Sequence, residues 1–231
     1  MGIIVIAIVF AIISGIVSSR LKSKFKRYSQ TPLASNMSGK DVAERMLRDN
    51  GINDVQVISV RGQLTDHYNP ANKTVNLSEP VYAGRNAASA AVAAHECGHA
   101  VQHATAYKML TLRTALVPIQ NVSGKILNFI MLASIFGGAF LFSTFPTDLV
   151  LMVIIGSYSI FTLFSFITLP VEFDASNRAL KWISSRGVVN PGEYDMAKDA
   201  LKWAALTYVV AALGSLVTLL YWLSIFMGRR N

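Results

Sequence analysis

Cysteine and charge are both scarce in this sequence of 231 residues. The single cysteine, Cys97, cannot form a disulfide within the chain, which excludes a secreted disulfide scaffold. Only 15% of the residues are charged, 52% are hydrophobic, and the mean hydropathy is +0.42. Disordered chains have the opposite composition, and soluble domains carry about 25% charged residues. The composition therefore excludes a disordered chain and a purely soluble enzyme, and it predicts a membrane protein.

Four long runs contain no charged residue, and they hold the hydrophobic excess. They comprise residues 2–19, 126–147, 149–171 and 203–228. Each is close to the roughly 20 residues that a helix needs to cross a bilayer. No basic residue precedes the first run and no small-x-small cleavage pattern ends it. We therefore interpret this run as an uncleaved transmembrane anchor, and we expect four transmembrane helices.

Basic residues indicate which side of the membrane the remaining segments occupy. Five of them lie between Arg20 and Arg27, directly after the first predicted span, and basic segments beside a span stay in the cytoplasm. We therefore expect residues 20–125 and 172–202 to be cytoplasmic parts of a multi-pass cell-membrane protein. The basic segment either only sets this topology or also binds anionic membrane lipids. No nucleic-acid partner is expected despite the net charge of +8, because the excess lies beside a membrane and lacks interleaved aromatics.

The cytoplasmic segments are predicted to be α+β. Ser38 and Asp41 can cap a short amphipathic helix, and an alanine-rich helix should run from about residue 86 to 105. Pro170 is predicted to open a helix that Gly187 closes, and residues 190–193 form a capping box for the helix leading to the fourth span. Strands are predicted at residues 55–60, 64–68 and 74–77.

The motif that carries chemistry is His-Glu-Cys-Gly-His at residues 95–99. Residues four apart lie one above the other on a helix, so both imidazoles can bind one tetrahedral Zn²⁺. Glu96 then points towards the water that zinc activates, as its general base. The alanine-rich helix is the context that this chemistry requires, so the motif predicts a zinc hydrolase.

A catalytic zinc needs a third protein ligand, for which the sequence offers several candidates. His103 lies four residues beyond His99, but a straight helix turns about 40° with each such step, which carries His103 away from the His95 face. The glycine that breaks the helix after the second histidine in metzincins is absent. Glu172, directly after the third span, is the favoured ligand, and Asp174 remains an alternative.

These residues carry a resemblance to a known family. Residues 93–103 around the motif, residues 68–78 upstream and Glu-Phe-Asp-Ala-Ser at 172–176 resemble the YugP-type family of bacterial membrane zinc metallopeptidases over nearly the whole chain. The resemblance implies a multi-pass zinc peptidase with His95, His99 and a later Glu as ligands and Glu96 as catalyst. The chain is more distantly similar to the HtpX and CAAX prenyl protease group, in which an Asp stands at the position of Ser176.

Three further side chains or segments are given expected roles. Arg178 can stabilise the oxyanion of the transition state, although a solvated helix residue is the simpler interpretation. Cys97 is expected to be a packed, reduced thiol and not a ligand. An extended substrate is expected to pair with an edge strand at residues 73–77, with a paired structural strand as the alternative.

The fold class that follows is an α-helical multi-pass membrane protein with a small α+β zincin-like domain. Its function is that of a gluzincin-like zinc endopeptidase that cleaves membrane-associated or unfolded proteins, with Zn²⁺ as cofactor and a peptide or protein as substrate. A membrane adaptor that zinc merely stabilises is the rival interpretation, and only the enzyme needs Glu96. The sequence does not indicate an oligomeric state.

Overall fold

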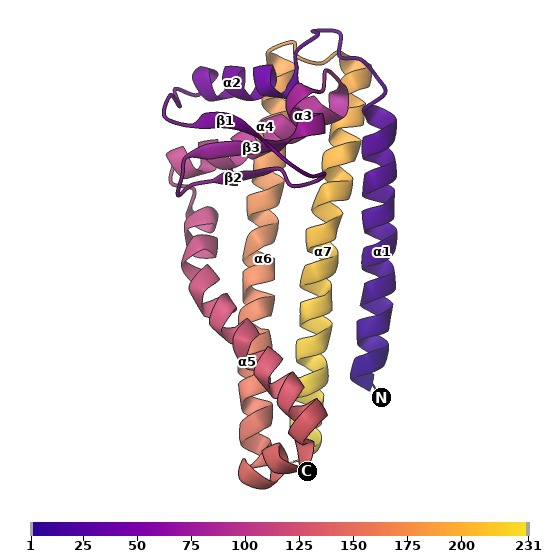
Figure 1. The fold of residues 1–231 in the computed structure, drawn as a ribbon, viewed down its shortest axis with the longest axis vertical. Coiled ribbons are helices and arrows are strands. Elements are labelled where there is room, and N and C mark those ends of the chain that lie inside the picture. The colour runs from indigo at the N-terminus through magenta and orange to yellow at the C-terminus, as the bar shows by residue number, and fades with distance from the viewer. Residues whose placement is uncertain (1, 230–231) are drawn as a thin grey trace. The chain divides into compact units, whose positions relative to one another are not determined.

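The computed structural model of the protein describes residues 2–229, with the side chains of residues 138–143 excepted. The chain divides into two compact units, one formed by Met1–Gly15, Leu112–Leu169 and Tyr208–Asn231, the other by Ile16–Thr111 and Pro170–Thr207. The elements, shown in Figure 1, are α1 (Gly2–Tyr28), α2 (Gly39–Asp49), β1 (Gln56–Val60), β2 (His67–Asn69), β3 (Thr74–Ser78), α3 (Glu79–Ala83), α4 (Ala87–Ala104), α5 (Lys108–Thr144), α6 (Thr147–Ser185) and α7 (Pro191–Gly228).

The first unit consists of the apolar parts of four long helices. α1, α5, α6 and α7 are each long and apolar enough to cross a membrane, as the sequence predicts. Their large hydrophobic side chains are mostly exposed, and Phe136 and Ile135 reach 84% and 66%. A surface of exposed apolar side chains is favourable in contact with lipid and unfavourable in contact with water. The chain is therefore a membrane protein.

The helices extend beyond the predicted spans, and one prediction about them is wrong. Pro170 does not open a new helix, because α6 continues through it from Thr147 to Ser185. Proline is tolerated inside transmembrane helices, and strong helical sequence lies on both sides of it. At the start of α7 the predicted capping box is confirmed: Asn190 Oδ1 accepts from the Glu193 amide at 2.9 Å, and the Glu193 carboxylate accepts from the Asn190 amide at 2.8 Å.

The second unit contains a three-stranded sheet with the order β1-β3-β2 (Figure 1). β2 and β3 form the predicted antiparallel pair, and β1 runs parallel to β3. β3 is therefore the central strand, with both of its edges paired. The expectation that a substrate pairs with residues 73–77 is thus wrong, because alternation of polar and apolar residues does not distinguish a central strand from an edge strand.

Two helices build the core of this unit. α2 begins after the predicted cap Ser38, which forms a capping box with Asp41. Along α4, almost every side chain is buried, and most are alanine or another small residue. Small side chains let a helix be enclosed on nearly all sides without overpacking. Cys97 on α4 contacts the Ala43 carbonyl of α2 through Sγ at 3.5 Å, which agrees with the expected packed thiol.

A glycine lets α4 approach α6 closely. A Cβ placed on Gly98 would lie 2.6 Å from the Ala175 carbonyl oxygen, well inside the distance that real side chains allow. Any other residue at position 98 would push the two helices apart. This contact brings residues 95–99 of α4 alongside residues 172–176 of α6.

Candidate metal centre

His95, His99 and Glu172 converge at the contact between α4 and α6. Each offers one ligand atom, and the three atoms lie within 4.8 Å of one another. His95 Nε2 lies 3.3 Å from Glu172 Oε2, and His99 Nε2 lies 3.6 Å from the same oxygen. Ligand atoms of a tetrahedral zinc, each 2.0 to 2.1 Å from the metal, are separated by about 3.3 to 3.4 Å. The three side chains are thus spaced as zinc ligands.

Gln102 fixes the tautomer of His99. Its Nε2 donates to the Val171 carbonyl at 2.7 Å and to Asp174 Oδ2 at 2.8 Å, which assigns the orientation of the amide. The amide oxygen consequently faces His99 Nδ1 at 3.0 Å and can only accept a hydrogen bond from its N–H. When the imidazole is neutral, its Nε2 therefore presents a lone pair towards Glu172, as a metal ligand must.

Ser176 supports the other imidazole. Its Oγ lies 3.1 Å from His95 Nδ1, on the side of the ring opposite the ligand atom. A hydrogen bond at this nitrogen orients the ring for metal binding, although a hydroxyl supplies no negative charge. The serine thus supports His95 with weaker electrostatic stabilisation than a carboxylate would give.

The environment of Glu172 fits a cation. Its Oε2 is buried and has no well-formed hydrogen bond within the described part of the chain, although two imidazole nitrogens face it. Burial opposes ionisation of this carboxyl group, but the imidazoles favour the carboxylate more strongly and hold the pKa of Glu172 well below its ordinary value. Burial likewise lowers the pKa of His99, yet Glu172 and Glu96 outweigh it and raise the net value. A buried carboxylate facing two nitrogen lone pairs is stable only with a proton or a cation between them.

Glu96 lies beside the ligands but outside the ligand set. Its side chain is buried, and Oε2 accepts a hydrogen bond of 3.0 Å from the Tyr68 backbone amide on β2. Because β2 is the outer strand of the sheet, this amide points away from β3. The carboxylate is therefore held at the open edge of the sheet, next to His95.

His103 is not part of this cluster. Its Nδ1 lies 2.9 Å from the Tyr68 hydroxyl, and the two rings are 5.8 Å apart. The helical rotation predicted from the sequence accounts for this separation from the His95 face. Of the candidates for third ligand, the structure brings Glu172 to the two histidines; Asp174 instead accepts from Gln102.

Arg178 reaches the centre only through other side chains. Its Nε donates to Asp174 Oδ2 at 2.6 Å, and its guanidinium lies over the Tyr107 ring. Asp174 in turn accepts from Gln102, which contacts His99. Contact with an oxyanion stays a prediction for Arg178. The contact between Gln102 and His99 was not predicted from the sequence. Their spacing of three residues on one helix was enough to suggest that the two side chains meet.

Comparison with known proteins gives a consistent result over nearly the whole chain. The family model described as "Putative neutral zinc metallopeptidase" matches residues 3–227. The chain is 42% identical over 213 residues to "Putative membrane protease YugP" of Bacillus subtilis (strain 168), and the match covers 92% of this chain and 91% of that protein. No solved structure matches the chain significantly.

Proposed function

This chain belongs to the neutral zinc metallopeptidase family, and we propose that it is a membrane-embedded endopeptidase that cleaves membrane-associated or unfolded proteins. Zinc is its cofactor. We assign His95, His99 and Glu172 as the ligands and Glu96 as the general base. The observation that carries the proposal is the spacing of the ligand atoms of three side chains that are each at most 13% exposed, with a further carboxylate, Glu96, on the same helix as the two histidines.

The residues divide the chemistry between them. Zinc held by His95, His99 and Glu172 would supply Lewis-acid polarisation of the scissile carbonyl and would lower the pKa of the attacking water. Glu96 takes a proton from that water and passes it to the leaving amine. The Tyr68 amide holds the Glu96 carboxylate in place, while Gln102 and Ser176 orient the two imidazoles. No side chain needs to form a covalent intermediate.

Two broader assignments belong to the same proposal. We assign residues 20–111 and 172–202 to one zincin-like peptidase domain, since the ligands come from both segments and the sheet edge lies next to Glu96. Residues 112–125, which the sequence analysis placed in the same domain, belong to the unit of long apolar helices. We place this domain in the cytoplasm because of the basic residues that follow the first span.

The proposal is tested by Glu96→Gln. The amide cannot accept a proton from water, so hydrolysis of a fluorescent unfolded protein should fall by at least a factor of about 10². Zinc content, measured by mass spectrometry of the purified protein, should stay near one ion per chain because Glu96 is not a ligand. Glu44→Gln on the exposed face of α2 is the matched control and should retain full activity. Undiminished hydrolysis in Glu96→Gln would refute the mechanism, and absent hydrolysis by the unaltered, zinc-loaded protein would favour the adaptor.

A further inference from the structure

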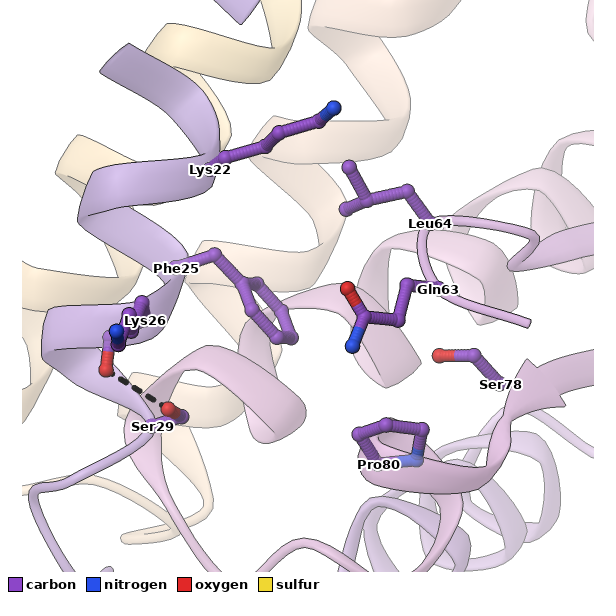
Figure 2. Close-up of a pocket in the computed structure, with 8 residues that line it drawn as sticks. All are labelled: Lys22, Phe25, Lys26, Ser29, Gln63, Leu64, Ser78 and Pro80. Atoms are coloured by element: carbon purple, nitrogen blue, oxygen red, sulfur yellow. Dashed lines mark hydrogen bonds between the residues drawn. The ribbon is translucent and has the colours of Figure 1, made fainter. Parts of the chain in front are cut away.

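A cavity of about 460 Å³ lies beside the end of α1, apart from the metal centre (Figure 2). Its size is within the range of ligand-binding pockets. Phe25 and Gln63 point towards one another across it, and Lys22 extends beside Leu64. The lining residues are Lys22, Phe25, Lys26, Ser29, Gln63, Leu64, Ser78 and Pro80.

The charge of this cavity is unbalanced. Two of its eight lining residues are lysines, and none is an acid. No carboxylate within residues 2–229 is found in an ion pair with Lys22 or Lys26. Lys24, on another face of the same helix, differs from them because its Nζ lies 2.9 Å from Asp199 Oδ2. The fold thus neutralises Lys24 and leaves two neighbouring ammonium groups beside a partly apolar cavity, which favours an anionic, amphiphilic ligand.

The position of the cavity along α1 indicates where that ligand comes from. The first predicted span ends at Ser19, so a rise of about 1.5 Å per residue places Lys22 about 4.5 Å beyond it and Lys26 about 10 Å beyond it. The headgroup layer extends roughly 5 to 8 Å from the hydrocarbon core on each side. The two lysines therefore bracket the depth at which lipid phosphates lie.

The geometry points to a binding site for the headgroup of one anionic phospholipid. The flexible stems of Lys22 and Lys26, one turn apart, let both ammonium groups reach one phosphate. Phe25 and Leu64 contact the apolar part of the glycerol backbone, and Gln63 offers an amide to its oxygens. The nearby acid, Asp66, is turned to Ser78, whose amide and hydroxyl both donate to it.

Leu64 gives a second indication that the cavity binds a ligand, and it allows a matched pair of variants to test the charge of that ligand. It is 44% exposed and has a φ of 57°, a left-handed conformation that is unfavourable for leucine. Asparagine and aspartate tolerate this conformation better. Leu64→Asn and Leu64→Asp therefore both relieve the backbone and have nearly the same size, but only Leu64→Asp adds a negative charge at the cavity.

The experiment titrates phosphatidylglycerol into the full-length protein in detergent and counts bound lipids by native mass spectrometry. Phosphatidylcholine and inorganic phosphate are the parallel probes. The double variant Lys22→Gln/Lys26→Gln should bind the first phosphatidylglycerol roughly thirtyfold more weakly, since each lysine near lipid contributes about 1 kcal/mol. The control Arg20→Gln/Arg27→Gln removes the same charge from exposed residues that do not line the cavity. Zinc content near one ion per chain verifies that each variant is folded.

Support for the site requires three results together. One phosphatidylglycerol binds saturably and in preference to phosphatidylcholine, the lysine pair weakens it far more than the arginine pair, and Leu64→Asp weakens it more than Leu64→Asn. If the two double variants lose the same affinity for phosphatidylglycerol, the basic segment attracts lipid only by its overall charge, and the cavity is not a specific site. If inorganic phosphate binds as tightly as the lipid, the proposal is wrong and the cavity binds free anions. If an acidic peptide displaces the lipid, the proposal is wrong and the cavity binds peptides.

Discussion

Gln102 orients His99 in the metal centre, a role that its residue type alone does not suggest. It is fully buried, and it joins His99 to the Val171 carbonyl and to Asp174. A buried amide with all these partners has one orientation, so it fixes both the ring angle and the tautomer of a zinc ligand. The proposed ligand set of His95, His99 and Glu172 therefore depends on a residue that is not itself one of the ligands.

We predict that Gln102→Leu weakens zinc binding by roughly 10- to 100-fold, because the His99 Nδ1 proton loses its acceptor. Competition with a fluorescent chelator measures the affinity. Gln56→Leu, at an exposed position of β1, is the control and should leave the affinity unchanged. Equal affinities in the unaltered protein and in Gln102→Leu would show that the His99 ring is held by its packing alone.

At the residue scale, the sequence predicted what local spacing determines. The four-residue step of a helix was enough to pair His95 with His99 and to set His103 aside. Glu172 required an assumption about the side of the membrane, since 73 positions separate it from His99. The contact of Gln102 with His99 was missed although both lie on α4, whereas its contacts with Val171 and Asp174 depend on how α4 and α6 pack together. The partner of Ser176 depends on the same packing.

At the scale of elements, the contact between α4 and α6 determines whether the centre forms. α6 is continuous through Pro170, so the segment that carries Glu172 is helical, and it packs against α4. Gly98 and Ala175 are the closest point of this contact. The small residue inside the metal motif thus has a packing reason in addition to its helical position.

Gly98→Ala should separate the two helices and weaken zinc binding by at least tenfold. The new methyl group would lie 2.6 Å from a backbone oxygen, which cannot move aside as a flexible side chain could. Overpacking of this kind costs about 1 to 3 kcal/mol of unfolding free energy. Zinc affinity and thermal unfolding of the purified protein measure both effects.

Gly156→Ala is the control for this substitution. Gly156 also lies on α6, and a Cβ there meets nothing within 4 Å. This variant should retain zinc and thermal stability. A Gly98→Ala protein that binds zinc as tightly as Gly156→Ala would mean that the close contact does not position Glu172.

Local features of the helices were predicted from the sequence, whereas the pairing of the strands and the continuity of α6 were not. Capping residues identified the starts of α2 and α7, because a cap is a local interaction, and the run of alanines identified α4. The sequence did not predict that β3 is the central strand. β1 comes before β2 in the chain, yet it pairs in parallel with the free side of β3. The prediction that a new helix begins at Pro170 was wrong, because proline is tolerated inside a membrane helix and α6 continues through it.

At the scale of the whole molecule, the chain joins lipid-exposed helices to a polar unit that holds the metal centre. The side of the membrane on which this unit lies is a prediction from the basic residues. In a Cys97→Ser background, a cysteine at Asn72 should be shielded from an impermeant thiol reagent added to intact cells. A cysteine at Asp148, between the second and third predicted spans, should react.

The two labelling positions serve as controls for each other. Both should react after the membrane is permeabilised, which verifies that each thiol is accessible. Cys97 is replaced as a precaution, although it is buried and its burial raises the pKa of the thiol well above the ordinary value. Labelling of Asn72→Cys alone in intact cells would invert the topology and place the peptidase unit outside.

The central claim is that His95, His99 and Glu172 hold the zinc. X-ray absorption at the zinc edge of the purified protein tests it most directly, because the outer atoms of an imidazole ring give their own scattering signal and a thiolate gives a longer distance than nitrogen or oxygen. The account predicts two imidazole nitrogens at about 2.0 to 2.1 Å, oxygen ligands at about 2.0 to 2.2 Å and no sulfur. It also predicts that Glu172→Ala changes this spectrum and that His103→Ala does not. A sulfur at about 2.3 Å would implicate Cys97 and contradict the account, as would a third imidazole that disappears in His103→Ala.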